Sequence, residues 1–137
     1  MITRLTGRVL RVEGNAAEVE VGDRGLVYEV LLPGYEASRV AGLVGQEVTL
    51  HTREHLEAIG QGTAFVPRML GFASASDGRF FEVFTSVKGL GLKKGLRALA
   101  MPPGEVAGAI VRRDAKALQA LPEIGKRLAE TIVAELS

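Results

Sequence analysis

Two short stretches of the chain repeat one pattern of residues that suits the binding of anions. Val87–Gly95 aligns position by position with Leu121–Ala129. Each stretch places an apolar residue before a glycine and a basic residue two positions after that glycine, where a helical pattern begins. Because the glycine and the charge keep the same register in both copies, the repeat indicates a shared chemical task.

The glycine of this pattern is expected in a tight turn, where main-chain N–H groups approach a phosphate with no Cβ in the way. The helix that begins at once adds unpaired N–H donors and the positive end of its dipole. Lys93, Lys94, Lys126 and Arg127 then supply positive charge. Such contacts hold a sugar-phosphate backbone and read no bases, so we expect DNA binding that is sequence-independent and salt-sensitive.

The charge distribution hints at an anion-facing second half, although charge alone would favour ordinary solvated helix faces. The net charge is only +1, but residues 73–137 carry ten basic and seven acidic side chains, whereas residues 1–72 carry seven and nine. A single copy of the motif would favour the connector; two copies in register favour DNA. Leu90 and Ile124, inside the two turns, are expected to plug the hydrophobic core of their own hairpins.

Several classes of protein are disfavoured by composition. The 137 residues include no cysteine, no apolar run long enough to cross a bilayer and no secretion signal, so we expect a cytoplasmic protein without disulfides. His51 and His55 lack further ligands for a metal. No phosphate-binding loop, zinc ligand set or nucleophile–base pairing is present. We therefore expect no catalytic residues, no metal and no cofactor.

The elements that must position the motif divide the chain into a β part and a helical part. Strands are expected at Thr6–Val12, Ala17–Val21, Leu26–Leu32, Glu47–Thr52 and Val66–Phe72, with an exposed loop at His55–Thr63. Short strands with turn-rich joints suggest a small barrel of the OB type over residues 1–72. Over residues 73–137 the apolar period changes to that of helices. The expected helices are a stripe at Phe80–Val87 capped by Ser76-Asp77, a helix through Leu96–Ala100 and helices around Val106–Val111, Leu118–Leu121 and Ile132–Leu136.

The order of these motifs resembles the RuvA family. The opening Met1–Gly7, then Gly25–Val30, Leu70–Phe72 and the two glycine-basic repeats carry the resemblance over nearly the whole chain. It implies an α+β, two-domain protein: an OB-fold barrel at 1–72 and a double helix-hairpin-helix domain at 73–137. It further implies a homotetramer that holds a four-way DNA junction, with a RuvB-type ATPase and a RuvC-type nuclease as partners. The positions that it assigns to DNA-backbone contact are Gly89, Leu90, Gly91, Lys93, Lys94, Ile124, Gly125, Lys126 and Arg127.

Four features depart from the family pattern. Glu123 stands where the second hairpin usually has glycine, so we expect electrostatic repulsion of phosphate, and backbone strain if its φ is positive. Leu92 replaces a proline. The family's acidic pin is altered, and Glu54 and Glu57 are the nearest candidates for it. The given sequence ends at Ser137, before the small domain with which the family engages the ATPase. The chain is therefore either a fragment or a short relative whose contact with a RuvB-type motor is doubtful.

Two other functions remain open at this point. The first is an enzyme such as a base-excision glycosylase, which would need a catalytic residue beyond the second hairpin; only Lys126–Ser137 follows Gly125, so we do not expect one. The second is a diverged RuvA-like paralogue that acts as a general DNA-binding or protein-interaction scaffold without junction specificity. Glu123, the altered pin and the missing tail favour that alternative.

Overall fold

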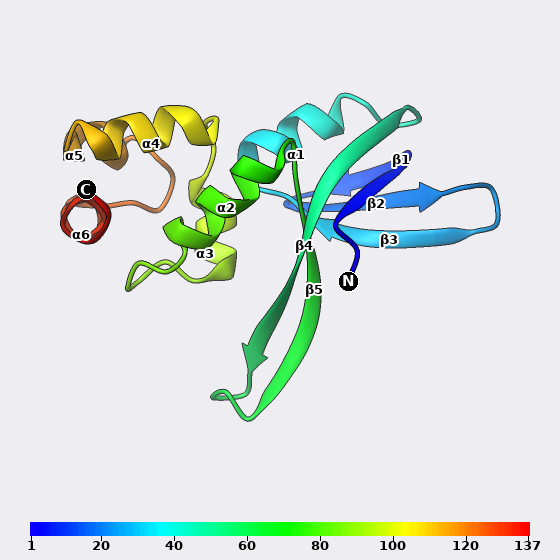
Figure 1. Ribbon diagram of the computed structural model, residues 1–137, viewed down its shortest axis with the longest axis horizontal. Coiled ribbons are helices and arrows are strands. Elements are labelled where there is room, and N and C mark those ends of the chain that lie inside the picture. Colours follow the sequence, from blue (N-terminus) through cyan, green and yellow to red (C-terminus); the bar gives the residue numbers. More distant parts are fainter.

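A closed barrel of five strands is followed by a group of five helices in the computed structural model, which describes residues 1–137 (Figure 1). The strands run in the order β1-β2-β3-β5-β4 around the barrel. Their bounds are Arg4–Glu13 (β1), Ala16–Val21 (β2), Leu26–Leu31 (β3), Glu47–Ile59 (β4) and Ala64–Phe72 (β5). The expected α+β architecture with an OB-like barrel is confirmed.

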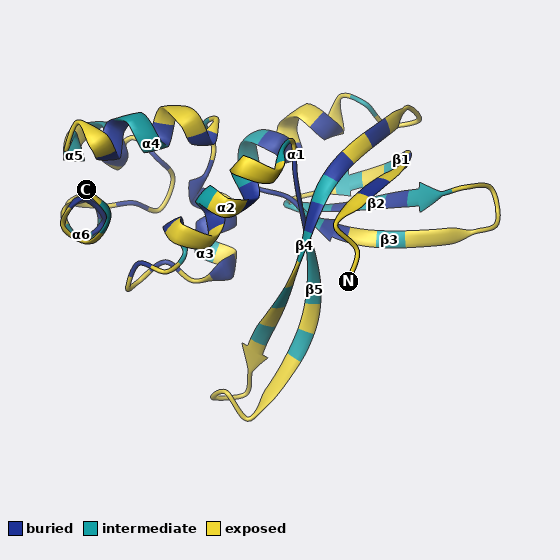
Figure 2. Cartoon of the chain, in the orientation of Figure 1, coloured by how far each residue is buried: buried dark blue, intermediate teal, exposed yellow.

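Alternation of apolar and polar residues explains how β1 closes against its neighbours. Leu5, Gly7 and Val9 point into the barrel, while the residues between them are exposed. Gly7 is required by close approach, since a Cβ there would lie 2.4 Å from the carbonyl oxygen of Glu20 on β2. The inward-facing residues of the barrel, together with Ala37 and Val40 of the helix that follows β3, form a core of ten buried side chains. The buried residues appear as dark blue bands along the ribbon in Figure 2.

The outer halves of β4 and β5 form a long hairpin that projects from the barrel (Figure 1). The expected loop at His55–Thr63 is therefore wrong: residues up to Ile59 continue β4 in register with β5, and only Gly60–Thr63 form the turn. Polar and apolar residues alternate from His55 to Ala58, which is the period of a strand. Phe65, near the tip, leaves 61% of its surface exposed.

A short helix, α1 (Gly34–Ala41), follows β3 and was not expected, because Pro33-Gly34 was interpreted only as the end of a strand. It ties the barrel to the helices. The Tyr35 N–H donates to the carbonyl oxygen of Leu99 at 3.1 Å, and the Tyr35 hydroxyl donates to Asp77 at 2.5 Å. Burial, with help from this hydrogen bond, raises the pKa of Tyr35 above its usual range.

The helices pack around a second core of 19 buried residues, to which Leu70 and Phe72 of β5 also belong. Their bounds are Ala75–Phe84 (α2), Leu92–Ala98 (α3), Pro103–Val111 (α4), Ala115–Gln119 (α5) and Lys126–Leu136 (α6). None of them is long and apolar enough to span a bilayer.

Helix boundaries differ from expectation in detail. Ser74, not Ser76-Asp77, caps α2, because its hydroxyl accepts the amide of Asp77 at 3.2 Å. The structure ends α3 at Ala98, so Leu99 and Ala100 lie beyond it, and α5 ends before Leu121.

We predict that Gly95→Ala destabilises the protein by about 1–3 kcal/mol, because the new Cβ overpacks the crossing of α3 and α2. That Cβ would lie 2.6 Å from Cγ2 of Thr85, whose hydroxyl is bonded to the carbonyl oxygen of Phe81 at 2.8 Å. The matched control is Gly104→Ala in α4, where nothing lies within 4 Å of the added Cβ. Urea unfolding measures both variants, and equal stability would contradict this account of the crossing.

Candidate nucleic-acid interface

The first turn (Val87–Leu90) connects α2 to α3 through a hydrogen-bonded β-turn. The Leu90 N–H donates to the carbonyl oxygen of Val87 at 3.0 Å. Gly89, the third residue of the turn, has a φ of +96°, which glycine adopts without strain. Gly91 is the N-cap of α3, and its carbonyl oxygen accepts the Gly95 N–H at 2.8 Å. The helix α3 therefore begins directly after the turn.

The second turn (Leu121–Ile124) connects α5 to α6 with the same bonds as the first. The Ile124 N–H donates to Leu121 at 3.3 Å, and the Gly125 carbonyl accepts the Ala129 N–H at 2.9 Å. Pro122 occupies the second position, where a turn of this type favours proline. The repeat that was recognised in the sequence is thus a repeat of backbone geometry.

Each turn leaves a run of amide groups without a partner inside the molecule. Gly91 and the three residues after it donate to no backbone or side-chain acceptor, and the same holds for Gly125 and the three residues after it. Converging N–H groups of this kind bind anionic oxygen. The N-termini of the two helices are not equivalent, because α6 has 11 residues and α3 has only seven. Anion binding at the first turn therefore depends more on its lysines than on the helix dipole.

The side chains assigned to DNA contact separate into two groups. Lys93, Lys126 and Arg127 are exposed and Lys94 is half-buried, so all four can reach a ligand. Leu90 and Ile124 are buried at 2% and 4% exposure, and their N–H groups are already used in the turns. These two residues hold the turns in the core as plugs, and they have no free donor for a phosphate.

Glu123 occupies the third position of the second turn with a φ of +64°, the left-handed conformation on which the expected strain depended. Its carboxylate does not point freely to solvent. Arg97 on α3 donates to both carboxylate oxygens, with Nη2 at 3.1 Å from Oε1 and Nε also bonded to Oε2. This hydrogen bonding lowers the pKa of the Glu123 carboxyl, and the charges of Arg97 and Lys94 act in the same direction.

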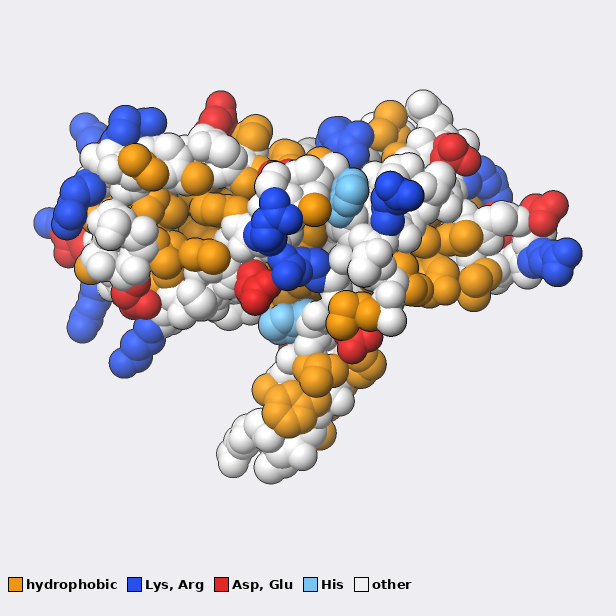
Figure 3. All heavy atoms as spheres, in the orientation of Figure 1, with side chains coloured by type: hydrophobic (Ala, Val, Ile, Leu, Met, Phe, Trp, Pro, Cys, Tyr) orange, Lys and Arg blue, Asp and Glu red, His pale blue; other side chains and the backbone are white.

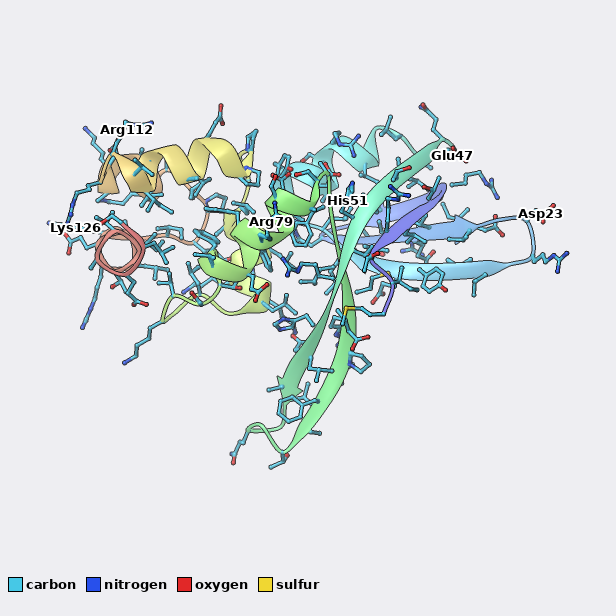
Figure 4. The ribbon with its side chains drawn as sticks, in the orientation of Figure 1. Asp23, Glu47, His51, Arg79, Arg112 and Lys126 are labelled. Atoms are coloured by element: carbon cyan, nitrogen blue, oxygen red, sulfur yellow. The ribbon has the colours of Figure 1, made fainter.

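Sequence reasoning missed several basic residues at the end of the helical domain. Arg112, Arg113 and Lys116, around the junction of α4 and α5, are all accessible and have no ion pair. Figure 3 shows blue side chains gathered over this end of the molecule, and Figure 4 labels Arg112 and Lys126 there. The net positive charge of the second half was the available signal, but it did not identify a face.

A cleft of about 870 Å³ lies between β4 and α2 and is lined by His51 and Arg79 among others (Figure 4). Its cations are balanced by acids: Arg53 Nη2 pairs with Glu82 Oε2 at 2.8 Å across it. No group of three or more His, Asp or Glu side chains is placed to hold a metal. The cleft therefore presents no net positive surface comparable to the two turns.

The two pin candidates do not form an adjacent acidic pair. Glu54 is exposed on β4, whereas Glu57 is half-buried and accepts from Arg68 Nε at 3.0 Å. An odd separation along a strand places their side chains on opposite faces of the β4–β5 hairpin. The turn of that hairpin, Gly60–Thr63, carries no charge.

We predict that the Arg97–Glu123 pair makes stability depend on pH. A carboxyl whose pKa is lowered by folding stabilises the protein above its unfolded pKa, and this contribution disappears as the pH falls through the folded pKa. Glu123→Gln should therefore lower the Tm at neutral pH and low salt, but only slightly, because the ion pair is exposed and screened by solvent. In acid the carboxyl is protonated, so the substitution should have no effect on the Tm there. Glu130→Gln, which removes an exposed, unpaired carboxylate of α6, is the control. Thermal melts at both pH values measure the difference, and an equal effect of the two variants at neutral pH would refute it.

Comparison with known proteins covers both halves of the chain. Residues 1–58 match the family described as RuvA N terminal domain, and residues 81–137 match the SAM-like helix-hairpin-helix tandem. Three relatives are called Holliday junction branch migration complex subunit RuvA. They come from Rhodopirellula baltica (36% identical), Desulfatibacillum aliphaticivorans (37%) and Geobacter metallireducens (33%), and each aligns with 99% of this chain. The chain spans 64–65% of the length of these relatives. The barrel and the tandem helix-hairpin-helix region together show that this chain belongs to the RuvA family.

Proposed function

We propose that the protein binds branched DNA, in particular a four-way junction, through the sugar-phosphate backbone and without sequence preference. The observation that carries this proposal is the pair of turns. Each presents four successive unpaired N–H groups beside exposed basic side chains, and the two copies share one backbone geometry. A duplex phosphate backbone offers anionic oxygens at regular intervals, so two such sites can hold two phosphates in a fixed relation.

The contact residues in this proposal are the glycines and basic side chains of the two turns. Gly91 and Gly125 contribute main-chain N–H groups, and Gly89 shapes the first turn. The charges come from Lys93, Lys94, Lys126 and Arg127. Leu90 and Ile124 act only by anchoring the turns in the core.

The junction, rather than DNA in general, is proposed from the relatives' printed names, which describe a Holliday junction branch migration complex. The proposal includes a homotetramer, a cytoplasmic location and a scaffold without catalysis of its own. It assigns ATP hydrolysis to a RuvB-type partner and strand cleavage to a RuvC-type partner. It also keeps the division into a barrel domain at 1–72 and a DNA-binding domain at 73–137. Apolar side chains exposed on the barrel, such as Leu26, Val27 and Leu56, are available for contacts between subunits.

Charge reversal at the first turn tests the proposed contact. Lys93→Glu combined with Lys94→Glu should weaken binding to a synthetic four-way junction by at least roughly tenfold, because two charge-assisted contacts become repulsive. The slope of log affinity against log salt should become shallower by about two units, since about one counterion is released per phosphate contact. Fluorescence anisotropy at several salt concentrations measures both quantities.

The control is Arg24→Glu, in the exposed turn beside Asp23 at the end of the molecule opposite Lys126 (Figure 4). This variant should bind the junction nearly as the wild type does. If the lysine variant also binds with unchanged affinity and slope, the first turn is not part of the DNA interface.

A further inference from the structure

Arg97 links α3, the helix that follows the first turn, to the second turn. It lies on α3, one helical turn after Lys93, and its guanidinium holds the Glu123 carboxylate through two hydrogen bonds. Both side chains are accessible, with 51% of Arg97 and 35% of Glu123 exposed. A bidentate pair at the surface fixes two long side chains in one geometry, which few exposed pairs do.

The surroundings of the Glu123 carboxylate are those of a bound anion. The fork of Arg97 meets it from one side, and the charge of Lys94 lies close enough to favour its ionised form. Carboxylate and phosphate each offer a guanidinium two anionic oxygens that can accept a bidentate pair of hydrogen bonds, and arginine binds either of them in this way. The face of α3 that carries Lys94 and Arg97 is therefore an anion site whose occupant is part of the same chain.

The first turn places no carboxylate on the helix that it faces, although the two turns are arranged alike. Gly89 is the equivalent of Glu123, and its missing Cβ would lie 3.4 Å from Cδ1 of Leu128 on α6. Leu128 is in turn the equivalent of Lys94. Each turn thus faces the helix of the other, but only Glu123 extends a charge across the gap, and it does so from a strained backbone conformation.

We propose that Arg97 is a DNA-phosphate contact that Glu123 masks, so that Glu123 acts as a built-in competitor of the DNA backbone. This inference rests on the proposed function and adds a residue that the two-turn motif did not include. A phosphate that approaches α3 must displace the carboxylate from Arg97. The affinity of the domain for DNA is therefore held below the value that its cations would give.

Substitutions at the two positions separate masking from a purely structural role. Glu123→Gly removes the competitor and the backbone strain, and it should tighten binding to a synthetic four-way junction by roughly tenfold. The salt slope should steepen by about one unit, because one more phosphate is contacted. Adding Arg97→Ala to this variant should abolish both gains. Anisotropy titrations of the full chain over a range of salt concentrations give the affinities and slopes.

Two controls keep the outcome clear. Glu123→Gln keeps the size of the side chain and should give a smaller gain in the same direction. Glu105→Gln makes the same change in net charge on α4, at an exposed carboxylate with no ion pair, and should leave binding nearly unchanged. Circular dichroism and melting temperature report whether each variant is folded.

Three outcomes would overturn the inference. If both Glu123 variants bind the junction no more tightly than the wild type, the Arg97–Glu123 pair is purely structural and masks no DNA contact. If the gain survives in Glu123→Gly combined with Arg97→Ala, it comes from removed repulsion and Arg97 touches no phosphate. In both cases the reversal of Lys93 and Lys94 would still weaken binding, so the proposed function would stand. Absence of DNA binding by the wild type would remove both proposals together.

Discussion

Two buried side chains, Leu90 and Ile124, set the position of each candidate contact in the helical domain. Each lies at the end of a β-turn and is held in the core, so the next residue, a glycine, must begin a helix at the surface. This arrangement leaves the first amide groups of the helix facing outward without acceptors. The basic side chains of Lys93 and Arg127 then follow at the same distance in both copies. Burial of an apolar plug is thus the constraint that keeps polar donors available to a ligand.

The barrel and α1 hold the helical domain, and with it the two turns, in a fixed position. The end of β5 contributes Leu70 and Phe72 to the helical core, and the ring of Phe72 lies 5.4 Å from that of Phe81 on α2. Through α1, the barrel also bonds to the end of α3 and the start of α2. The two turns are therefore held relative to the barrel as well as to each other. Such rigidity suits a scaffold that must hold DNA strands in a defined geometry.

The barrel, the helical half and the repeated turn could be predicted because each rests on local patterns: alternation, helical period and glycine at fixed offsets. At Glu123 the expectation was conditional, with backbone strain only if φ is positive, and the structure places its φ at +64°. Two elements were missed for local reasons, since α1 begins with glycine and the outer part of β4 carries charged residues beside a glycine-rich turn. The Arg97–Glu123 pair could not be predicted, because its partners are far apart in the sequence and meet only through the crossing of the two hairpins.

A competition titration shows whether the paired turns hold branched DNA. A labelled synthetic four-way junction is titrated with the protein in a gel-shift assay, at two salt concentrations, with unlabelled duplex of equal length as competitor. If the turns hold the junction, we expect discrete shifted bands that resist the duplex competitor and weaken steeply as salt is raised. Weak binding that duplex removes equally well would contradict this expectation, and would favour a diverged scaffold whose partner is a protein.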